Sequence, residues 1–332
     1  MSAPADLVVT GIGVVSPLAA MAALAAPPRA GNAAPAPAAD AWFDADARLG
    51  PRGHKYLPPA ARYLLAAAGD ALADAGDCLA GIPEERRGAA VGTNHAVAAL
   101  HARMDRTVIS EGADGLSPAT APFFSVNLFG SHLSGRFALK AFNVTVTSPG
   151  VAGLEAVQMG LRAVTAGRSA LLLAAATEEA REGGTHTDSG AVALVFERRQ
   201  AATARPVRRH GSCRVRSAFV PPSLLREASG RAQARDRLVA HLAEPGADAP
   251  PTHLVLDDSP VAAVAAQAVG ATGAAVTYEA VGSGSLRPML RLAGLLAVAR
   301  GPARLVSAIA QGHVAWAETR PEDARADGSA PC

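Results

Sequence analysis

Apolar residues along this chain fall into two patterns, and the patterns alternate. Continuous apolar runs over Asp6–Val15, Gly88–Gly92 and Ser169–Ala176 are typical of strands buried on both faces. Between these runs, Pro59–Gly76 and Leu154–Ala166 place apolar residues at helical spacing. Strands that alternate with helices predict a layered α/β protein.

The remainder of the chain continues this alternation. Strands are expected at Phe142–Thr147 and Ala191–Glu197, and a second half that begins near Ala204 repeats the pattern. The elements predicted there are a basic strand, a helix around Leu224–Leu242, the strand His253–Asp257, the helix Val261–Val269 and the apolar segments Met289–Ala299 and Arg304–Ala310. The alanine- and proline-rich segment from Leu18 to Asp40 predicts a mobile or poorly packed loop.

Composition narrows the class of protein. The chain has 332 residues, enough for one large domain or two packed halves, and its 49% apolar but only 4% aromatic content predicts a core of alanine, valine and leucine. A net charge of +2 argues against a dedicated nucleic-acid binder, and no apolar run has the length needed to cross a membrane. Cys78, Cys213 and Cys332 show neither paired nor metal-ligand spacing, which favours a reducing cytoplasm.

Two short patterns carry no prediction of a cofactor or a metal. Gly11 and Gly13 suggest a dinucleotide-binding loop, but Ser16 occupies the third glycine position and no suitably placed acid follows. We therefore interpret these glycines as a bend beside a closely packed neighbour. His95 and His101 are six residues apart, a spacing that does not place two ligands on one helix face.

The stretch Phe123–Gly153 carries most of the candidate chemistry. It contains an aromatic and amide-bearing segment, a short polar connection, a strand, and a turn at Ser148, Pro149 and Gly150 that opens a helix. A strand that turns sharply into a helix N-terminus suits a nucleophile, because the free amides and the helix dipole stabilise negative charge. This turn offers no thiol.

Several motifs in the same order resemble the β-ketoacyl synthases of the thiolase-like superfamily. Val8–Leu18 matches the family's VVTGxGxVSPxG, Tyr63–Gly76 its YALAAAxxALxDAG, and Val91–Val97 its VGTGxGG. The longest match, to SPFFxxxxxxNMxAGHLSxxFGLKGPNxxxxTAC, consists of Ala121 to Phe124, Asn127 and Leu128, Ser131 to Ser134, and Phe137 to Asn143. The resemblance covers most of the chain and thins after about residue 205.

This resemblance implies a thiolase-like layered α/β/α/β/α fold with two pseudo-repeated halves and a shortened second half. The halves are expected at residues 1–203 and 204–320, as one integrated unit, with a disordered tail at 321–332. Neither a metal nor a cofactor is implied.

The chain departs from the family at the positions that carry its chemistry. The nucleophilic cysteine falls on Gly150, and the two histidines fall near Asp257 and Val281. Condensation then lacks its nucleophile and the donors that hold the malonyl carboxylate and the enolate. Ser148 is a weak alternative nucleophile, because no histidine can be placed beside it. A cap or turn role suits it better.

One family role fits these departures: a chain-length-factor-type subunit that pairs with an active ketosynthase and shapes the acyl tunnel in polyketide, polyene or fatty acyl chain assembly. Candidate tunnel or interface residues are Phe123, Phe124, Asn127, Phe129 and His132, for which ordinary core packing is an equal alternative. Candidate residues for docking an acyl carrier protein are Arg208, Arg209 and Arg214, within a basic run that also suits a solvated strand.

Two other functions stay open at this stage. One is a residual acyltransferase or malonyl decarboxylase that uses Ser148, and the other is a decayed homodimer without a pathway role. The expected partners are an active ketosynthase or a second copy of this chain, together with an acyl carrier protein. Nucleic acid and membrane are not expected as partners.

Overall fold

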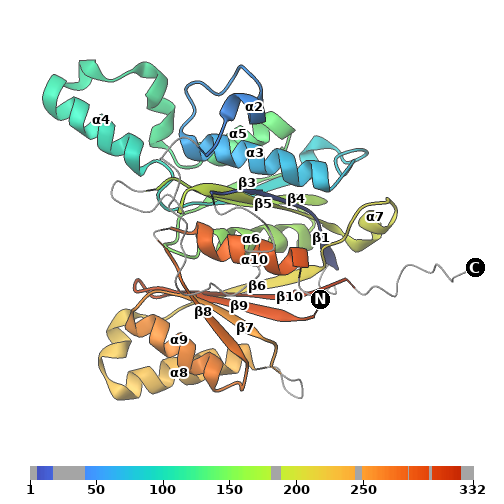
Figure 1. Ribbon diagram of the computed structural model, residues 1–332, viewed down its shortest axis with the longest axis vertical. Helices are drawn as coiled ribbons and strands as arrows, with labels where there is room; N and C mark the ends of the chain where they lie inside the picture. Colours follow the sequence, from blue (N-terminus) through green and yellow to red (C-terminus); the bar gives the residue numbers. More distant parts are fainter. Residues whose placement is uncertain are drawn as a thin grey trace, which may run out of the picture.

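Two β-sheets and the helices between and around them form the fold (Figure 1). The computed structural model describes residues 6–17, 42–180, 188–243, 249–282, 284–298 and 301–322. The loop predicted between Leu18 and Asp40, the thiol of Cys332 and residues 323–332 of the predicted tail lie outside this part of the chain.

Each sheet has five strands, and the two sheets share one topology. The first runs in the order β1-β5-β4-β2-β3 and the second in the order β6-β10-β9-β7-β8. In each sheet three neighbouring strands are parallel and the other two continue the sheet antiparallel. The strands are β1 (Leu7–Val15), β2 (Arg87–Gly92), β3 (Asn143–Val146), β4 (Leu171–Glu178), β5 (Gly190–Arg198), β6 (Ser212–Phe219), β7 (Thr252–Leu256), β8 (Val276–Ala280), β9 (Ala303–Ala308) and β10 (His313–Arg320).

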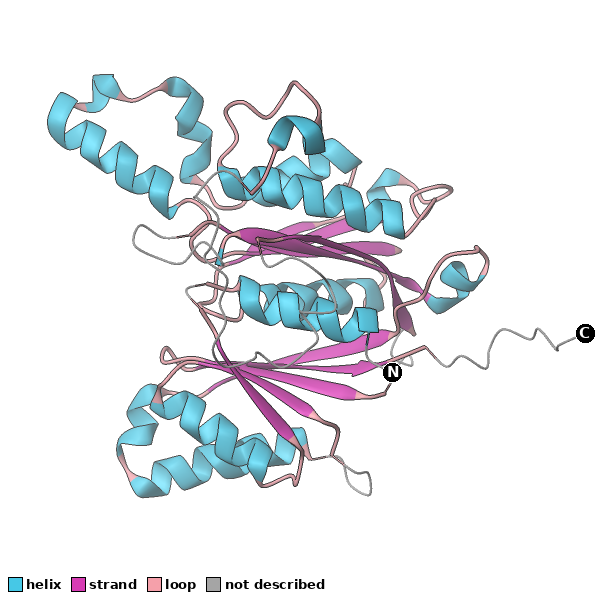
Figure 2. Ribbon diagram, viewed as in Figure 1, coloured by secondary structure: helices cyan, strands magenta, loops and turns pink. Residues whose placement is uncertain are grey.

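The helices complete five layers (Figure 2). Helices α6 (Ala152–Thr165) and α10 (Leu286–Val298) lie between the two sheets, and their apolar residues belong to the largest core cluster. The outer face of the first sheet is covered by α3 (Pro59–Asp74) and α5 (Leu128–Phe137), and that of the second by α8 (Ala228–Leu242) and α9 (Pro260–Gly270). The other helices of the described residues are α2 (Ala45–Leu49), α4 (Ala98–Glu111) and α7 (Arg199–Thr203), with 3-10 turns at Glu84–Arg86, Ala113–Gly115, Pro118–Phe124 and Pro222–Arg226.

The predicted α/β/α/β/α architecture with two similar halves is confirmed. The closely packed neighbour predicted beside Gly11 and Gly13 is α3, which lies directly against β1, and both glycines lie within this continuous strand. A Cβ atom on Gly13 would stand 1.9 Å from the carbonyl oxygen of Ala67, and one on Gly11 would stand 1.9 Å from that of Ala71. Only glycine permits this approach.

The pattern of apolar residues missed several elements. The segment that was expected to be a short polar connection is helix α5, whose serines and glycines weaken its helical signal. Gly130 in this helix allows contact with Asn143, because a Cβ atom there would stand 2.0 Å from the Asn143 side-chain oxygen. Strand β8 alternates between exposed and half-buried positions and lacks the continuous apolar run of a buried strand. No helix in the described ranges has the length and apolarity to span a bilayer.

Candidate functional site

The predicted strand-to-helix turn is present between β3 and α6. Gly150 lies in it with φ at 65°, the left-handed region that glycine enters without a steric penalty. Hydrogen bonds close the turn, since the Val151 amide donates to the Pro149 carbonyl at 2.8 Å and the Ala152 amide donates to the Ser148 carbonyl at 3.0 Å. The backbone therefore has the shape that would present a side chain at the α6 N-terminus.

The space beside Gly150 is occupied by Ile309. A Cβ atom built on Gly150 would stand 2.7 Å from Cγ2 and 3.2 Å from Cδ1 of Ile309, closer than such contacts normally are. Ile309 is only 3% exposed and follows β9 in a tight loop, where its amide donates to the His313 carbonyl at 3.2 Å. Any side chain at position 150 therefore requires Ile309 to move.

Asp257, where the first family histidine was expected, holds this loop. It follows β7, and its Oδ2 accepts a hydrogen bond of 2.7 Å from the amide of Ala310, the residue after Ile309. Its Oδ1 accepts a second, of 3.1 Å, from the amide of Ser259, the N-cap of α9. The carboxylate thus connects the end of β7 to the loop that carries Ile309.

Val281, where the second histidine was expected, is a core residue. It follows β8, is 7% exposed, and belongs to the same apolar cluster as Ile309. Its amide donates to the carbonyl of Leu256, the last residue of β7, at 3.0 Å. The structure therefore places Gly150, Asp257 and Val281 around one region, and none of the three supplies an imidazole or a thiol.

The alternative nucleophile, Ser148, is engaged with a carboxylate. Its hydroxyl donates to Oε2 of Glu155, a residue in the first turn of α6. Histidine usually activates a serine nucleophile, and here the acceptor is an acidic side chain. The contact connects the turn to the first turn of its helix.

Glu178 is a buried carboxylate at the end of β4 whose role was not predicted. Its Oε1 accepts hydrogen bonds from the Asn94 amide at 2.7 Å and from the amide and hydroxyl of Ser285 at 2.9 and 2.7 Å, and its Oε2 accepts from the His95 amide at 2.7 Å. Desolvation by burial raises the pKa of this carboxyl group, against the opposing effect of these donors. The available sequence signal was an acidic residue that closes an apolar run.

The aromatic interface candidates divide between core and surface. Phe129 is 2% exposed and packs in the core on the outer side of the first sheet. Phe123 is 6% exposed, and its ring is 6.1 Å from that of His132. Phe124 is 60% exposed and stacks on His101, with ring centroids 6.0 Å apart. Asn127 is exposed and accepts a hydrogen bond from Ser125.

The three arginines proposed for docking differ in their surroundings. Arg208 and Arg214 are exposed, and Arg208 also donates to the Ala297 carbonyl at 2.9 Å. Arg214 lies on β6 opposite Glu318 of β10. Arg209 is half-buried and forms an ion pair with Glu322 at 3.1 Å. Two of the three guanidinium groups are therefore presented to solvent.

Comparison with known families identifies the class of protein. Residues 11–215 match the family described as "Beta-ketoacyl synthase, N-terminal domain". The match covers more than half of the chain, so this chain belongs to the β-ketoacyl synthase family. A search of curated proteins found no match.

Known structures share the fold at low sequence identity. One is a ketosynthase complex with a type II PKS acyl-carrier protein (TM-score 0.74, 15% identity, 96% of this chain and 100% of that chain covered). The ishigamide ketosynthase/chain length factor has a TM-score of 0.70 and 21% identity, with 95% and 99% covered. A β-ketoacyl synthase from Burkholderia phymatum STM815 has a TM-score of 0.68 and 17% identity, with 96% and 100% covered. These likenesses show the fold.

Proposed function

We propose that this chain is a ketosynthase-like subunit that forms no acyl-enzyme of its own. It pairs with an active β-ketoacyl synthase and shapes the acyl tunnel of that pair, in the manner of a chain length factor, in polyketide, polyene or fatty acyl chain assembly. The proposed location is the cytoplasm.

The observation that carries this proposal is the occupation by Ile309 of the space next to Gly150. The turn keeps the geometry of a nucleophile site, while glycine removes the reactive group and a buried isoleucine fills its place. Asp257 holds the loop that carries this isoleucine, because its carboxylate accepts a hydrogen bond from the Ala310 amide, and this contact links the two positions expected from the family resemblance. A fold that retains its architecture but fills its reaction site suits a supporting subunit.

A second observation concerns the surface that a partner would use. β3 is an edge strand of the first sheet and pairs only with β2 among the described strands. An open edge presents backbone groups that can pair with another chain. Phe124, at the end of the 3-10 turn before α5, is 60% exposed, and Ile109 on α4 is 85% exposed. Helix α4 projects from the outer layer in Figure 1. The edge and these apolar side chains offer an interface for an active synthase or for a second copy.

Co-expression with a competent ketosynthase tests this pairing directly. Size-exclusion chromatography with light scattering is expected to show a one-to-one complex. A chain that forms only a homodimer in the presence of the synthase would favour the alternative of a decayed homodimer. A chain that stays monomeric would contradict the pairing altogether.

A proline substitution on the edge strand locates the interface. Phe142 and Val146 direct their carbonyls to β2, so the alternation of a strand turns the backbone amide of Thr145 towards the open edge. Thr145→Pro removes that donor and is expected to abolish the complex. Tyr278→Pro is the matched control, because Tyr278 has the same position on β8, the corresponding edge of the second sheet.

An acyl carrier protein is the third component of the proposal. Arg208 and Arg214 are exposed cations that can attract an acidic carrier electrostatically. Charge reversal of both residues is expected to weaken carrier binding to the complex, and unchanged binding would remove the docking surface. Charge reversal of Arg209 serves as the comparison, because its guanidinium is already paired with Glu322.

A further inference from the structure

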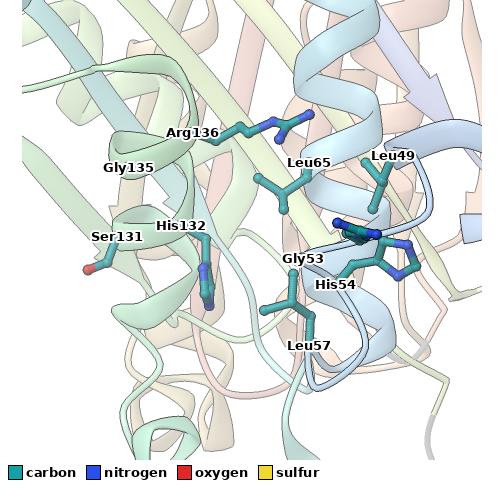
Figure 3. Close-up of a pocket in the computed structure, with 10 residues that line it drawn as sticks. Leu49, Gly53, His54, Leu57, Leu65, Ser131, His132, Gly135 and Arg136 are labelled. Atoms are coloured by element: carbon teal, nitrogen blue, oxygen red, sulfur yellow. The ribbon is translucent and has the colours of Figure 1, made fainter. Parts of the chain in front are cut away.

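A cavity of about 250 Å³ lies in the outer layer of the first sheet, away from the turn at Gly150. Its walls come from α5, from α3 and from the loop between α2 and α3 (Figure 3). The two sites are on opposite faces of the first sheet, because Gly150 opens α6 and α6 lies between the two sheets. Among the residues named as tunnel or interface candidates, His132 also lines this cavity, whereas Gly150, Asp257 and Val281 do not.

The lining of the cavity is basic. It contains two arginines and two histidines, and none of the described lining residues is acidic. The lining consists of Leu49, Arg52, Gly53, His54, Leu57, Leu65, Ser131, His132, Gly135 and Arg136. His132 and Arg136 are four residues apart on α5, so they share one face of that helix. In Figure 3 both leave α5 on the side that faces Leu57 and Leu65.

The two guanidinium groups are not neutralised within the described residues. Thirteen ion pairs are resolved there at 4.0 Å or less, and neither Arg52 nor Arg136 takes part in any of them. Both arginines line the cavity and are exposed to solvent, so a ligand can reach them. An arginine pair without a carboxylate is well suited to an oxyanion, because each guanidinium can donate two parallel hydrogen bonds.

The histidines add polar atoms that lack partners. Nε2 of His132 and Nδ1 of His54 are buried and have no hydrogen-bond partner among the described residues. Nε2 of His54 is already used, since it contacts the Gly50 carbonyl at 2.7 Å and the exposed carboxylate of Asp46 at 3.0 Å. Buried polar atoms are normally paired, and Nε2 of His132 has almost no accessible surface, so a ligand in the cavity meets other atoms of this residue.

We propose that this cavity binds a small phosphate-bearing anion. Arg52 and Arg136 supply both the charge and the hydrogen bonds. The cavity is slightly smaller than sites for drug-sized ligands, which occupy about 300–1,000 Å³. The leucine walls accept a short carbon chain beside the anionic group. A phosphate monoester and free phosphate share this chemistry.

Isothermal titration calorimetry of the full chain distinguishes the two sources. The probes are inorganic phosphate and glycerol 3-phosphate, with acetate as a monovalent anion of similar size. Both phosphates are expected to bind more tightly than acetate. If the affinity for glycerol 3-phosphate is higher than that for inorganic phosphate, the ligand of the site is a phosphate monoester. If the order is reversed, the ligand is the free phosphate ion. Phosphate binding no tighter than acetate binding would overturn the proposal.

Variants connect the binding to this cavity. Arg136→Gln and Arg52→Gln are each expected to weaken binding of both phosphates about tenfold. Arg168→Gln is the matched control, because Arg168 is an exposed arginine outside the cavity. Equal losses in Arg168→Gln and Arg136→Gln would show a nonspecific charge effect and overturn the proposal. Unchanged affinity in Arg136→Gln would overturn it as well.

Discussion

Cγ2 of Ile309 lies 2.7 Å from the position that a Cβ atom on Gly150 would occupy. Position 150 and the loop after β9 are therefore coupled: glycine permits the isoleucine, and the isoleucine excludes a larger residue. The left-handed φ of 65° at Gly150 adds a separate preference for glycine. The two effects can be separated by mutation.

Gly150→Ala is expected to lower the free energy of unfolding by about 2–4 kcal/mol, from the left-handed backbone and the overpacked contact together. Gly167→Ala is the matched control, because Gly167 has φ at 76° but nothing within 4 Å of its built Cβ. It is expected to cost only the backbone contribution, about 1–2 kcal/mol. Urea denaturation measures both changes, and equal losses at the two positions would contradict the contact with Ile309.

A double-mutant cycle tests the coupling itself. Ile309→Ala alone creates a cavity and is expected to cost about 2–5 kcal/mol. Combined with Gly150→Ala, the total loss is expected to be smaller than the sum of the single losses by about 1 kcal/mol or more, because the alanine methyl group enters the vacated space. Additive losses would show that the two side chains do not compete for one space.

Asp257→Ala is expected to loosen the loop that carries Ile309. The substitution leaves the amides of Ala310 and Ser259 without their acceptor, at a cost of about 1–3 kcal/mol. Amide hydrogen exchange is expected to accelerate at Ala310. The exposed neighbour Asp258 provides the control, and Asp258→Ala is expected to leave the exchange at Ala310 unchanged.

Glu178→Gln tests the connection among β4, Ser285 and the residues after β2. A glutamine has one acceptor oxygen, so its amide nitrogen must face either the His95 amide or the Ser285 and Asn94 donors. We expect a loss of about 1–3 kcal/mol in urea denaturation. A variant as stable as the natural chain would show that the carboxylate is dispensable for this connection.

Three buried imidazoles are expected to lower the stability of the fold when the pH is lowered from 7.5 to 5.5, whereas the raised pKa of Glu178 acts in the opposite direction. Burial lowers the pKa values of His132, His210 and His253, so the folded chain resists protonation that the unfolded chain accepts near its ordinary pKa of 6.5. The resulting stability is present above that pKa and is lost below it. The combined effect is on the order of 1 kcal/mol, because the rings are partly solvated.

Urea denaturation at several pH values checks this dependence. His253→Gln is expected to flatten it, whereas substitution of the exposed His241 is expected to leave it unchanged. A pH dependence that is the same in His253→Gln as in the natural chain would contradict the assignment to buried imidazoles.

The sequence predicted the layers better than it predicted the site. Long apolar strands such as Leu171–Glu178 and helices with a clear period such as Pro59–Asp74 are determined by local pattern, and they appear close to their predicted bounds. Helix α5 was missed because two glycines and two serines hide its period, and only contact with β3 explains why Gly130 is small.

The site itself depends on contacts between distant segments. The motif resemblance located Gly150 and Asp257, but nothing near either residue in sequence indicates that Ile309 fills the space or that Asp257 holds its loop. Asp257 and Ala310 are 53 positions apart in the sequence, and the pairing of β7 with β9 brings them together. The cavity lined by Arg52 and Arg136 likewise combines segments that no local pattern connects.

The central claim is that this chain carries no acyl group and that its partner does. Intact-protein mass spectrometry of the co-expressed complex, after incubation with an acyl- or malonyl-loaded carrier protein, tests it most directly. We predict an acyl adduct on the partner synthase and none on this chain. An adduct on this chain that disappears in Ser148→Ala would contradict the account and establish an acyl-transfer activity instead.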